Sequence, residues 1–185
     1  MGPYVTDTPL GLDFYKAPAD QQHSGFQAIM RGDLTPSPAD YALIRDLYDA
    51  DVAVTDYCVH RLLEVWKLRR ELGVVVVTSD HGEYLGEHGL MEHGQTVWPE
   101  VTSVPLVMAG PGLPTGQTVD TPVQLHDLTG TLLELAGVQT TMQSLLPVMK
   151  GEPRIGPIQA AAWKHPDPAK AIGGRFEHDW FWYRE

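Results

Sequence analysis

Four consecutive valines, at positions 74–77, constrain the fold of this chain more than any other feature of its sequence. β-Branched residues favour strands, and an apolar run without polar alternation is typical of a strand that is covered on both faces. Strands of that kind lie in parallel sheets whose two faces carry helices. The run therefore predicts an α/β fold with a central strand at 74–77.

A long amphipathic helix is predicted to lead into that strand. Ser37 can cap its start, Pro38 suits the first helical position, and Asp40 suits the positive end of the helix dipole. Gly73 stops the helix, and Cys58, the only cysteine of the chain, is expected to be buried on its apolar face. Apolar residues recur along the helix at spacings of three and four: Ile44, Leu47, Tyr48, Val52, Cys58, Leu62, Val65, Leu68 and Leu72.

The rest of the chain divides into short elements and irregular segments. Residues 104–108 predict a second strand, and residues 127–137 predict a helix that Gly ends, so the order of elements is typical of an α/β fold. Residues 1 to about 37 are rich in Pro, Gly and Asp and predict a long irregular segment. The sequence after about residue 150 is again rich in Pro and Gly. It ends in aromatic residues at 180–183, which predict a strand whose partner would follow it.

The charge of the chain excludes some classes of function. Its 13 Lys and Arg stand against 24 Asp and Glu, which gives a formal net charge of -11. Nucleic-acid binding needs a basic surface, so no nucleic-acid partner is expected. A small anionic substrate remains compatible with this charge, because a bound cation can reverse the local field. The longest apolar run, 74–77, is far too short for a membrane segment.

Residues that handle metals and protons are concentrated directly after the valine strand. Open α/β sheets place their ligands at the carboxyl ends of strands, which is where Asp80 and His81 fall. A carboxylate and an imidazole together can serve several divalent metals. The alternative is that Asp80 caps a turn and His81 bonds to the backbone. The remaining polar residues of the segment are Glu83, Glu87, His88, Glu92 and His93.

The motifs of this chain, in their order and spacing, resemble the sulfatase family of the alkaline phosphatase superfamily. The resemblance covers about residues 40–150 and implies an alkaline phosphatase-like mixed or parallel sheet flanked by helices. Its residues are Tyr48-Asp49-Ala50 with Asp56, the run Thr78-Ser79-Asp80-His81-Gly82 continuing to Gly89, His93, Ser103-Val104-Pro105-Leu106, Gly110-Pro111-Gly112, and Gln124-Leu125-His126-Asp127 leading to Val138.

The resemblance also implies a site. Asp80 and His81 correspond to two metal ligands of the family, with Ca²⁺ expected first and Mn²⁺, Zn²⁺ and Mg²⁺ as alternatives. His93 corresponds to a Lys or His that touches the sulfate, so it is expected to hold the transferring group or to protonate the leaving oxygen. The other polar residues of the motif are expected to shape the loop or support the ligands: Glu83, Glu87 and His88.

Parts of the family pattern have no counterpart here. The resemblance implies a formylglycine nucleophile made in a Cys/Ser-x-Pro-Ser/Ala-Arg motif, but Cys58 is followed by Val-His-Arg-Leu. The paired aspartates that begin the family's metal site are also absent, and residues 1–4 match only the tail of its Asp-x-His-x-Pro-Tyr segment. We therefore expect a fragment whose N-terminal half is missing. Residues 1–150 would be the C-terminal portion of a catalytic domain, and residues 151–185 the truncated start of a small C-terminal subdomain.

These observations predict a hydrolase of sulfate esters, acting on a small molecule or a saccharide in the complete enzyme. The chain alone, lacking the nucleophile, is expected to be inactive. A phosphonate or phosphodiester hydrolase of the same superfamily is an alternative, because the Asp-His pair is shared among these enzymes. The third possibility is a non-catalytic remnant or interaction module that exposes apolar surface.

Overall fold

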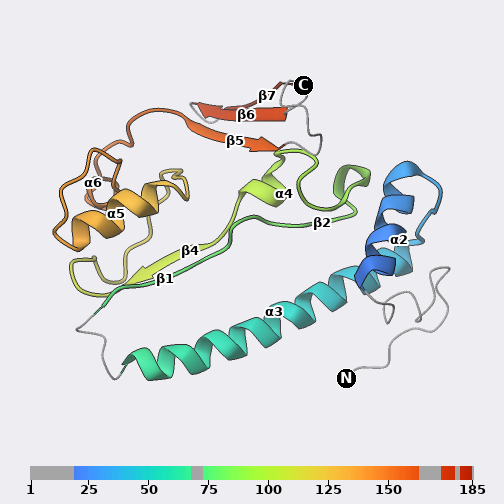
Figure 1. The fold of residues 1–185 in the computed structure, drawn as a ribbon, viewed down its shortest axis with the longest axis horizontal. Coiled ribbons are helices and arrows are strands. Elements are labelled where there is room, and N and C mark those ends of the chain that lie inside the picture. The colour runs from blue at the N-terminus through green and yellow to red at the C-terminus, as the bar shows by residue number, and fades with distance from the viewer. Residues whose placement is uncertain (1–18, 68–72, 163–171, 178–179, 185) are drawn as a thin grey trace. The chain divides into compact units, whose positions relative to one another are not determined.

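The computed structural model describes residues 19–67, 73–162, 172–177 and 180–184 (Figure 1). The chain divides into two compact units. The helical unit contains Met1–Leu68 and Glu83–His93, and the sheet unit contains Arg69–Gly82 and Gly94–Glu185. Helices and short strands occur together in both, which confirms the predicted α/β class.

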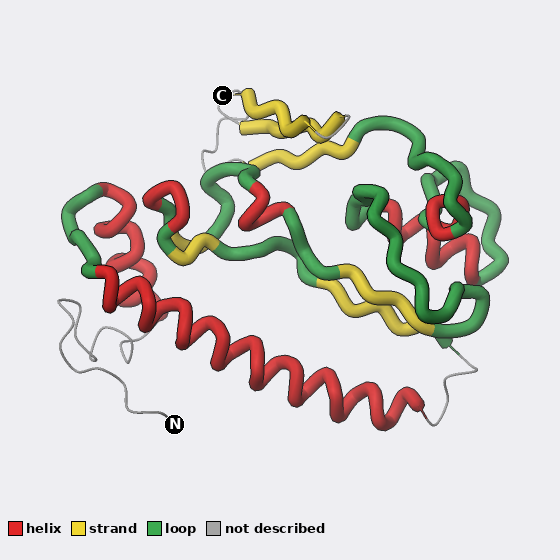
Figure 2. The backbone as a smooth tube through the Cα atoms, turned by 180° about the vertical axis from the view of Figure 1, so that it is seen from behind, coloured by secondary structure: helices red, strands yellow, loops and turns green. Residues whose placement is uncertain are grey.

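The described residues of the helical unit form two helices and a short hairpin, whose course can be followed in Figure 2. The helices are α2, Ala19–Arg31, and α3, Pro38–Lys67. The hairpin pairs β2, Tyr84–Leu85, antiparallel to β3, Met91–Glu92, with the 3₁₀ turn η2, Glu87–Gly89, between them. Ile29 of α2, Ile44 of α3 and Met91 of β3 are buried together, so the core of this unit joins all three elements.

The start of α3 confirms the predicted cap. Asp40 Oδ2 accepts hydrogen bonds from the backbone N–H and the hydroxyl of Ser37, at 2.7 and 2.8 Å. The Ser37 hydroxyl in turn accepts from the Asp40 N–H at 3.2 Å. This reciprocal arrangement satisfies backbone donors that a helix start leaves without intrahelical partners. Asp40 is fully buried, so the cap is also part of the packing.

Helix α2 corrects the prediction of an irregular segment at 1–37. Residues 1–18 lie outside the described part of the chain, but residues 19–31 are helical. Phe26, Ile29 and Met30, spaced three and four apart, bring one helix face to the core. The polar residues at the start of this helix obscured the spacing of three and four in the sequence. Packing of the apolar face against the core therefore decides that residues 19–31 are helical.

Most of α3 is exposed, which contradicts the predicted burial of Cys58. Its buried residues are Asp40, Leu43 and Ile44, all in its first two turns. Beyond them, apolar side chains lie at the surface: Tyr48, Val52, Val54, Tyr57, Leu62 and Val65. The helix is amphipathic as predicted, but a periodic apolar face does not ensure that a partner covers it. In the described part of the chain, no helix is long and apolar enough to cross a membrane.

In the sheet unit, β1, Val75–Thr78, pairs with β4, Leu106–Ala109. The pairing is antiparallel, with Val75 opposite Ala109 and Thr78 opposite Leu106. Both strands were predicted. Val75, Val76 and Val77 are only half-buried, however, so the expected coverage on both faces does not occur among the described residues.

A second sheet lies later in the chain. Strands β5, Ile158–Ala162, β6, Ile172–Glu177, and β7, Trp180–Arg184, pair antiparallel in the order β5-β6-β7. The predicted strand at 180–183 is confirmed, but its partner β6 precedes it instead of following it. Two glycines, Gly173 and Gly174, weaken the strand signal of β6 in the sequence.

The described residues of the sheet unit also form three short helices: α4, Pro99–Thr102, α5, Asp127–Leu135, and α6, Leu146–Met149. The predicted helix that begins at Asp127 is α5. The hydroxyl of Thr131, in the middle of α5, donates to the Asp127 carbonyl oxygen and accepts from the Leu145 N–H, at 2.7 and 2.8 Å. These bonds attach the segment before α6 to α5.

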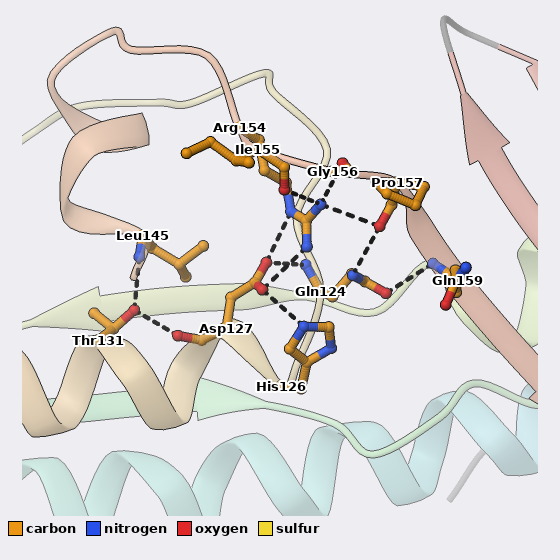
Figure 3. A network of polar contacts seen from close by, with 10 residues as sticks. All are labelled: Gln124, His126, Asp127, Thr131, Leu145, Arg154, Ile155, Gly156, Pro157 and Gln159. Carbon is orange, nitrogen blue, oxygen red and sulfur yellow. Dashed lines mark hydrogen bonds and ion pairs between the residues drawn. The ribbon is translucent and has the colours of Figure 1, made fainter. Parts of the chain in front are cut away.

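A buried ion pair anchors the start of α5 (Figure 3). The Asp127 carboxylate is fully buried and accepts two hydrogen bonds from the Arg154 guanidinium, at 2.9 and 3.0 Å. Its oxygens also accept from the Gln124 N–H at 3.0 Å, and the His126 Nε2 lies 3.1 Å from Oδ1. Arg154 Nη1 donates to three backbone carbonyls, those of Ile155, Gly156 and Pro157. A buried pair with its partners satisfied can be accommodated in a protein interior.

We predict that Asp127→Asn destabilises the chain by about 3–5 kcal/mol, because the buried Arg154 guanidinium loses its counter-charge. Urea unfolding followed by tryptophan fluorescence measures the change. Asp33→Asn is the matched control, since its ion pair with Arg31 is exposed on both sides and such pairs contribute about 1 kcal/mol or less. Equal losses from the two substitutions would contradict a special role for Asp127.

Candidate functional site

The loop at residues 79–82 follows β1 and carries both predicted metal ligands. The Ser79 hydroxyl donates to the His81 carbonyl oxygen at 2.7 Å, and Asp80 Oδ1 accepts from the His81 backbone N–H at 3.0 Å. Such local bonds shape polar turns, as the alternative interpretation of Asp80 proposed. The Asp80 side chain nevertheless remains 86% exposed, so its carboxylate is accessible to a cation from solvent.

The ring of His81 is oriented by the backbone beside it. Its Nδ1 lies 2.8 Å from the Gly82 carbonyl oxygen, and a carbonyl oxygen can only accept, so Nδ1 carries the proton. In the neutral ring, the lone pair is then on Nε2, which lies 3.6 Å from Asp80 Oδ2. A carboxylate oxygen and an imidazole nitrogen therefore lie side by side, and both are common ligands of divalent metals.

The environment of Asp80 favours its charged form. The charge of the neighbouring His81 contributes most to lowering the pKa of Asp80, and hydrogen bonds from Ser79 and from nearby backbone N–H groups lower it further. Desolvation acts in the opposite direction but does not reverse the shift. While His81 is protonated, the Asp80 carboxylate therefore stays ionised to a lower pH than usual.

The far end of the loop is attached to α4. The Gly82 N–H donates to the Val101 carbonyl oxygen at 2.9 Å. A Cβ atom at position 82 would collide with the Glu100 carbonyl oxygen and lie 3.1 Å from the Val101 Cα. Val101 is buried, so the backbone against which Gly82 rests is itself held by packing. Only glycine fits where the loop backbone lies this close to the backbone of α4.

The third predicted residue, His93, belongs to the helical unit. Its Nδ1 lies 3.2 and 3.4 Å from the two carboxylate oxygens of Glu83. Glu83 directly precedes β2 and His93 directly follows β3, and the hairpin register sets Tyr84 opposite Glu92. The next pair outward is therefore Glu83 and His93, so the antiparallel pairing explains their contact.

The tip of the hairpin is shaped by polar side chains, as predicted for Glu87 and His88. Glu87 accepts a hydrogen bond from the Leu85 N–H at 2.7 Å, and its carboxylate lies 3.8 Å from Arg45 of α3. The His88 ring meets the buried Tyr84 ring edge-on, with their centroids 6.3 Å apart. These contacts order the turn between the two strands.

The structure brings Asp80 and His81 together, and it gives His93 the partner Glu83. Among the described residues, no three His, Cys, Asp or Glu side chains gather into a set that could hold a metal ion. The contact of Glu83 with His93 was missed from the sequence. The two segments that flank the glycine-rich turn at 86–89 could have revealed it, because a hairpin there brings residues 83 and 93 opposite each other.

Comparison with known proteins gives consistent matches. The sequence model of one family, Sulfatase, matches residues 12–138, a range that includes Asp80, His81, Glu83 and His93. A protein named "Sulfatase" from Formosa agariphila is 39% identical over 94 residues, which are 50% of this chain and 18% of that protein. The choline-sulfatase of Rhizobium meliloti is 33% identical over 123 residues, covering 62% of this chain and 24% of the relative.

One solved structure is also similar in part. A putative sulfatase from Bacteroides thetaiotaomicron aligns with a TM-score of 0.41 and 28% identity, over 55% of this chain and 24% of that one. The matched segments thus cover less than a quarter of the length of each of these three proteins.

We predict that Gly82→Ala destabilises the sheet unit by about 1–3 kcal/mol, because the added methyl group forces the loop away from α4. Gly73→Ala is the control, since a Cβ there meets no atom within 4 Å and should change stability by about 0.5 kcal/mol or less. Urea unfolding of both variants measures the difference. A Gly82→Ala variant as stable as Gly73→Ala would contradict the described attachment.

Proposed function

The chain belongs to the sulfatase family, and we propose that it supplies part of the metal-dependent site with which a sulfatase hydrolyses sulfate esters. Sulfatase relatives support the hydrolase class. The substrate we propose is a sulfate ester of a small molecule or a saccharide. The matches cover less than a quarter of each relative. The activity of a whole sulfatase is therefore a proposal, which rests on this shared segment.

The observation that carries the proposal is the adjacent carboxylate and imidazole of Asp80 and His81. Asp80 Oδ2 and His81 Nε2 are 3.6 Å apart on one exposed loop. The Gly82 carbonyl holds the His81 proton on Nδ1, which is the arrangement that orients a metal-binding histidine. Two residues of this chain therefore fit as ligands of a divalent metal.

We propose Ca²⁺ as the first candidate for this metal, from the resemblance to the family, with Mn²⁺, Zn²⁺ and Mg²⁺ as alternatives. The mixed donor set is compatible with each of them, because carboxylate suits hard cations and imidazole suits borderline ones. A bound dication would supply positive charge to the sulfate oxygens. Asp80 contributes a negative charge to hold it.

His93 is proposed to contact the sulfate group or to give a proton to the leaving oxygen. An imidazole can do either when one ring nitrogen is held and the other faces the substrate. The nucleophile, a formylglycine by resemblance, would have to come from outside this sequence, which contains no Cys/Ser-x-Pro-x-Arg motif. Asp80 and His81 alone would bind a metal weakly, and without that nucleophile they would not complete the reaction.

We predict that the purified 185-residue chain does not hydrolyse 4-nitrophenyl sulfate above the buffer rate at any concentration of Ca²⁺ or Mn²⁺. The physical reason is the lack of a nucleophile with its activating partners. Release of 4-nitrophenol, measured by absorbance, tests this. Metal-dependent turnover that Asp80→Asn abolishes would overturn the proposed inactivity while supporting the ligand role.

A chimera tests the function itself. Residues 12–138 replace the corresponding segment of Rhizobium meliloti choline-sulfatase, and hydrolysis of choline sulfate is measured with added dication. We predict an active chimera whose kcat/KM falls at least about 100-fold on Asp80→Asn, since loss of a ligand should exceed the effect of losing a supporting residue. Asp120→Asn, at an exposed position of the same unit, is the control.

Two results of that experiment would count against the proposal. A chimera that keeps the circular dichroism of the parent but has no activity would contradict the proposed hydrolytic role of this segment. A chimera that is active and insensitive to Asp80→Asn would contradict the ligand role of Asp80 alone.

A further inference from the structure

The carboxylate of Glu83, an acidic residue of the motif, contacts a proposed catalytic side chain. Both of its oxygens lie within hydrogen-bonding distance of His93 Nδ1, at 3.2 and 3.4 Å. A carboxylate without a proton can only accept hydrogen bonds, so Nδ1 is the donor of this contact. The neutral ring then has its lone pair on Nε2.

The contact is held by elements that are themselves fixed. Tyr84, the next residue after Glu83, is fully buried, and Met91 on the opposite strand is buried in the core of the helical unit. Glu92, directly before His93, has a φ of 63°, a left-handed conformation that is uncommon outside glycine. A strained residue persists where the surrounding structure determines it, so the hairpin fixes the backbone from which the His93 side chain projects.

The pair is also partly shielded from solvent. The side chain of Glu83 is 29% exposed and that of His93 is 46% exposed. An exposed ion pair is held weakly, because water competes for both groups. Here the hairpin register adds to the attraction, because it places the two side chains opposite each other, so one ring orientation is favoured over the others.

We propose that Glu83 is a positioning residue for His93. Its carboxylate holds the proton on Nδ1 and thereby directs Nε2 to the reacting group. When Nε2 takes up a proton, the same carboxylate balances the charge of the imidazolium, as the acidic residue does in a catalytic triad. This inference rests on the proposed function for the role of Nε2, but the contact and the tautomer can be tested without any activity.

The alternative role for Glu83 is to shape the hairpin, as Glu87 does at its tip. The two roles make different demands on the side chain. A positioning residue needs only an acceptor opposite Nδ1, so glutamine should preserve the tautomer and alanine should not. A residue that shapes the loop would change the fold of the hairpin without selecting a tautomer.

The experiment is ¹⁵N NMR of the histidine rings in the 185-residue chain, with the tautomer of His93 read at the alkaline limit of a pH titration. We expect the Nδ1–H form to predominate in the natural sequence and in Glu83→Gln. In Glu83→Ala, the Nε2–H form, which unrestrained histidine prefers, should become the major one. Glu87→Ala is the matched control from the same hairpin and should leave His93 in the Nδ1–H form.

The backbone amide shifts of Tyr84 and Met91 report whether each variant keeps the hairpin. A predominant Nε2–H form in the natural sequence would overturn the inference. So would an unchanged tautomer in a Glu83→Ala variant whose hairpin amides are unshifted. If Glu83→Ala loses the hairpin, the test rests on the comparison of the natural sequence with Glu83→Gln. Loss of the Nδ1–H form in the glutamine variant would then contradict a positioning role.

The same variants in the choline-sulfatase chimera separate this inference from the proposed function. Glu83→Gln should lower kcat by about 10-fold, within the range of supporting residues, with little change in KM. A His93→Ala chimera with full activity would contradict the proposed role of His93, while the tautomer result would stand by itself. Equal activity in Glu83→Ala and the unsubstituted chimera, with His93→Ala inactive, would contradict the contribution of Glu83.

Discussion

The antiparallel pairing of β1 with β4 determines where the loop that carries Asp80 and His81 begins. The register places Thr78 opposite Leu106, so the chain turns away from the strand at residue 79. The hydrogen bond from Gly82 to Val101 returns it to α4 at 2.9 Å. Residues 79, 80 and 81 are all that remain between the two attachments. Both proposed ligands are therefore held by backbone contacts on either side.

The two histidines of the motif differ in what accepts their Nδ1 proton. For His81 the acceptor is the neutral carbonyl of Gly82 at 2.8 Å, whereas for His93 it is the carboxylate of Glu83 at 3.2 Å. The carbonyl acceptor orients the His81 ring and leaves the lone pair of the neutral ring on Nε2, which suits a metal ligand. The carboxylate acceptor orients the His93 ring in the way the acidic residue of a catalytic triad orients its histidine. The local chemistry therefore supports different roles for two similar side chains.

The sequence predicted what depends on neighbouring residues. The Ser37 cap of α3, the valine strand and the start of α5 at Asp127 all follow from local patterns, and the structure contains them. The sequence could not predict the features that depend on residues far away along the chain. Arg154 reaches Asp127 across 27 positions, and the exposure of Cys58 depends on what packs against α3. Helix α2 was missed because its polar start hides a short apolar face that only the core completes.

Titration of the ¹⁵N-labelled chain with Mn²⁺ tests the central claim most directly, because a paramagnetic ion broadens the amide signals nearest to it. A half site formed by Asp80 and His81 predicts that residues 79–82 broaden first and that Asp80→Asn removes this effect. Broadening that begins at surface carboxylates elsewhere, such as Asp49 and Asp51 of α3, and that Asp80→Asn leaves unchanged would contradict the proposed metal site.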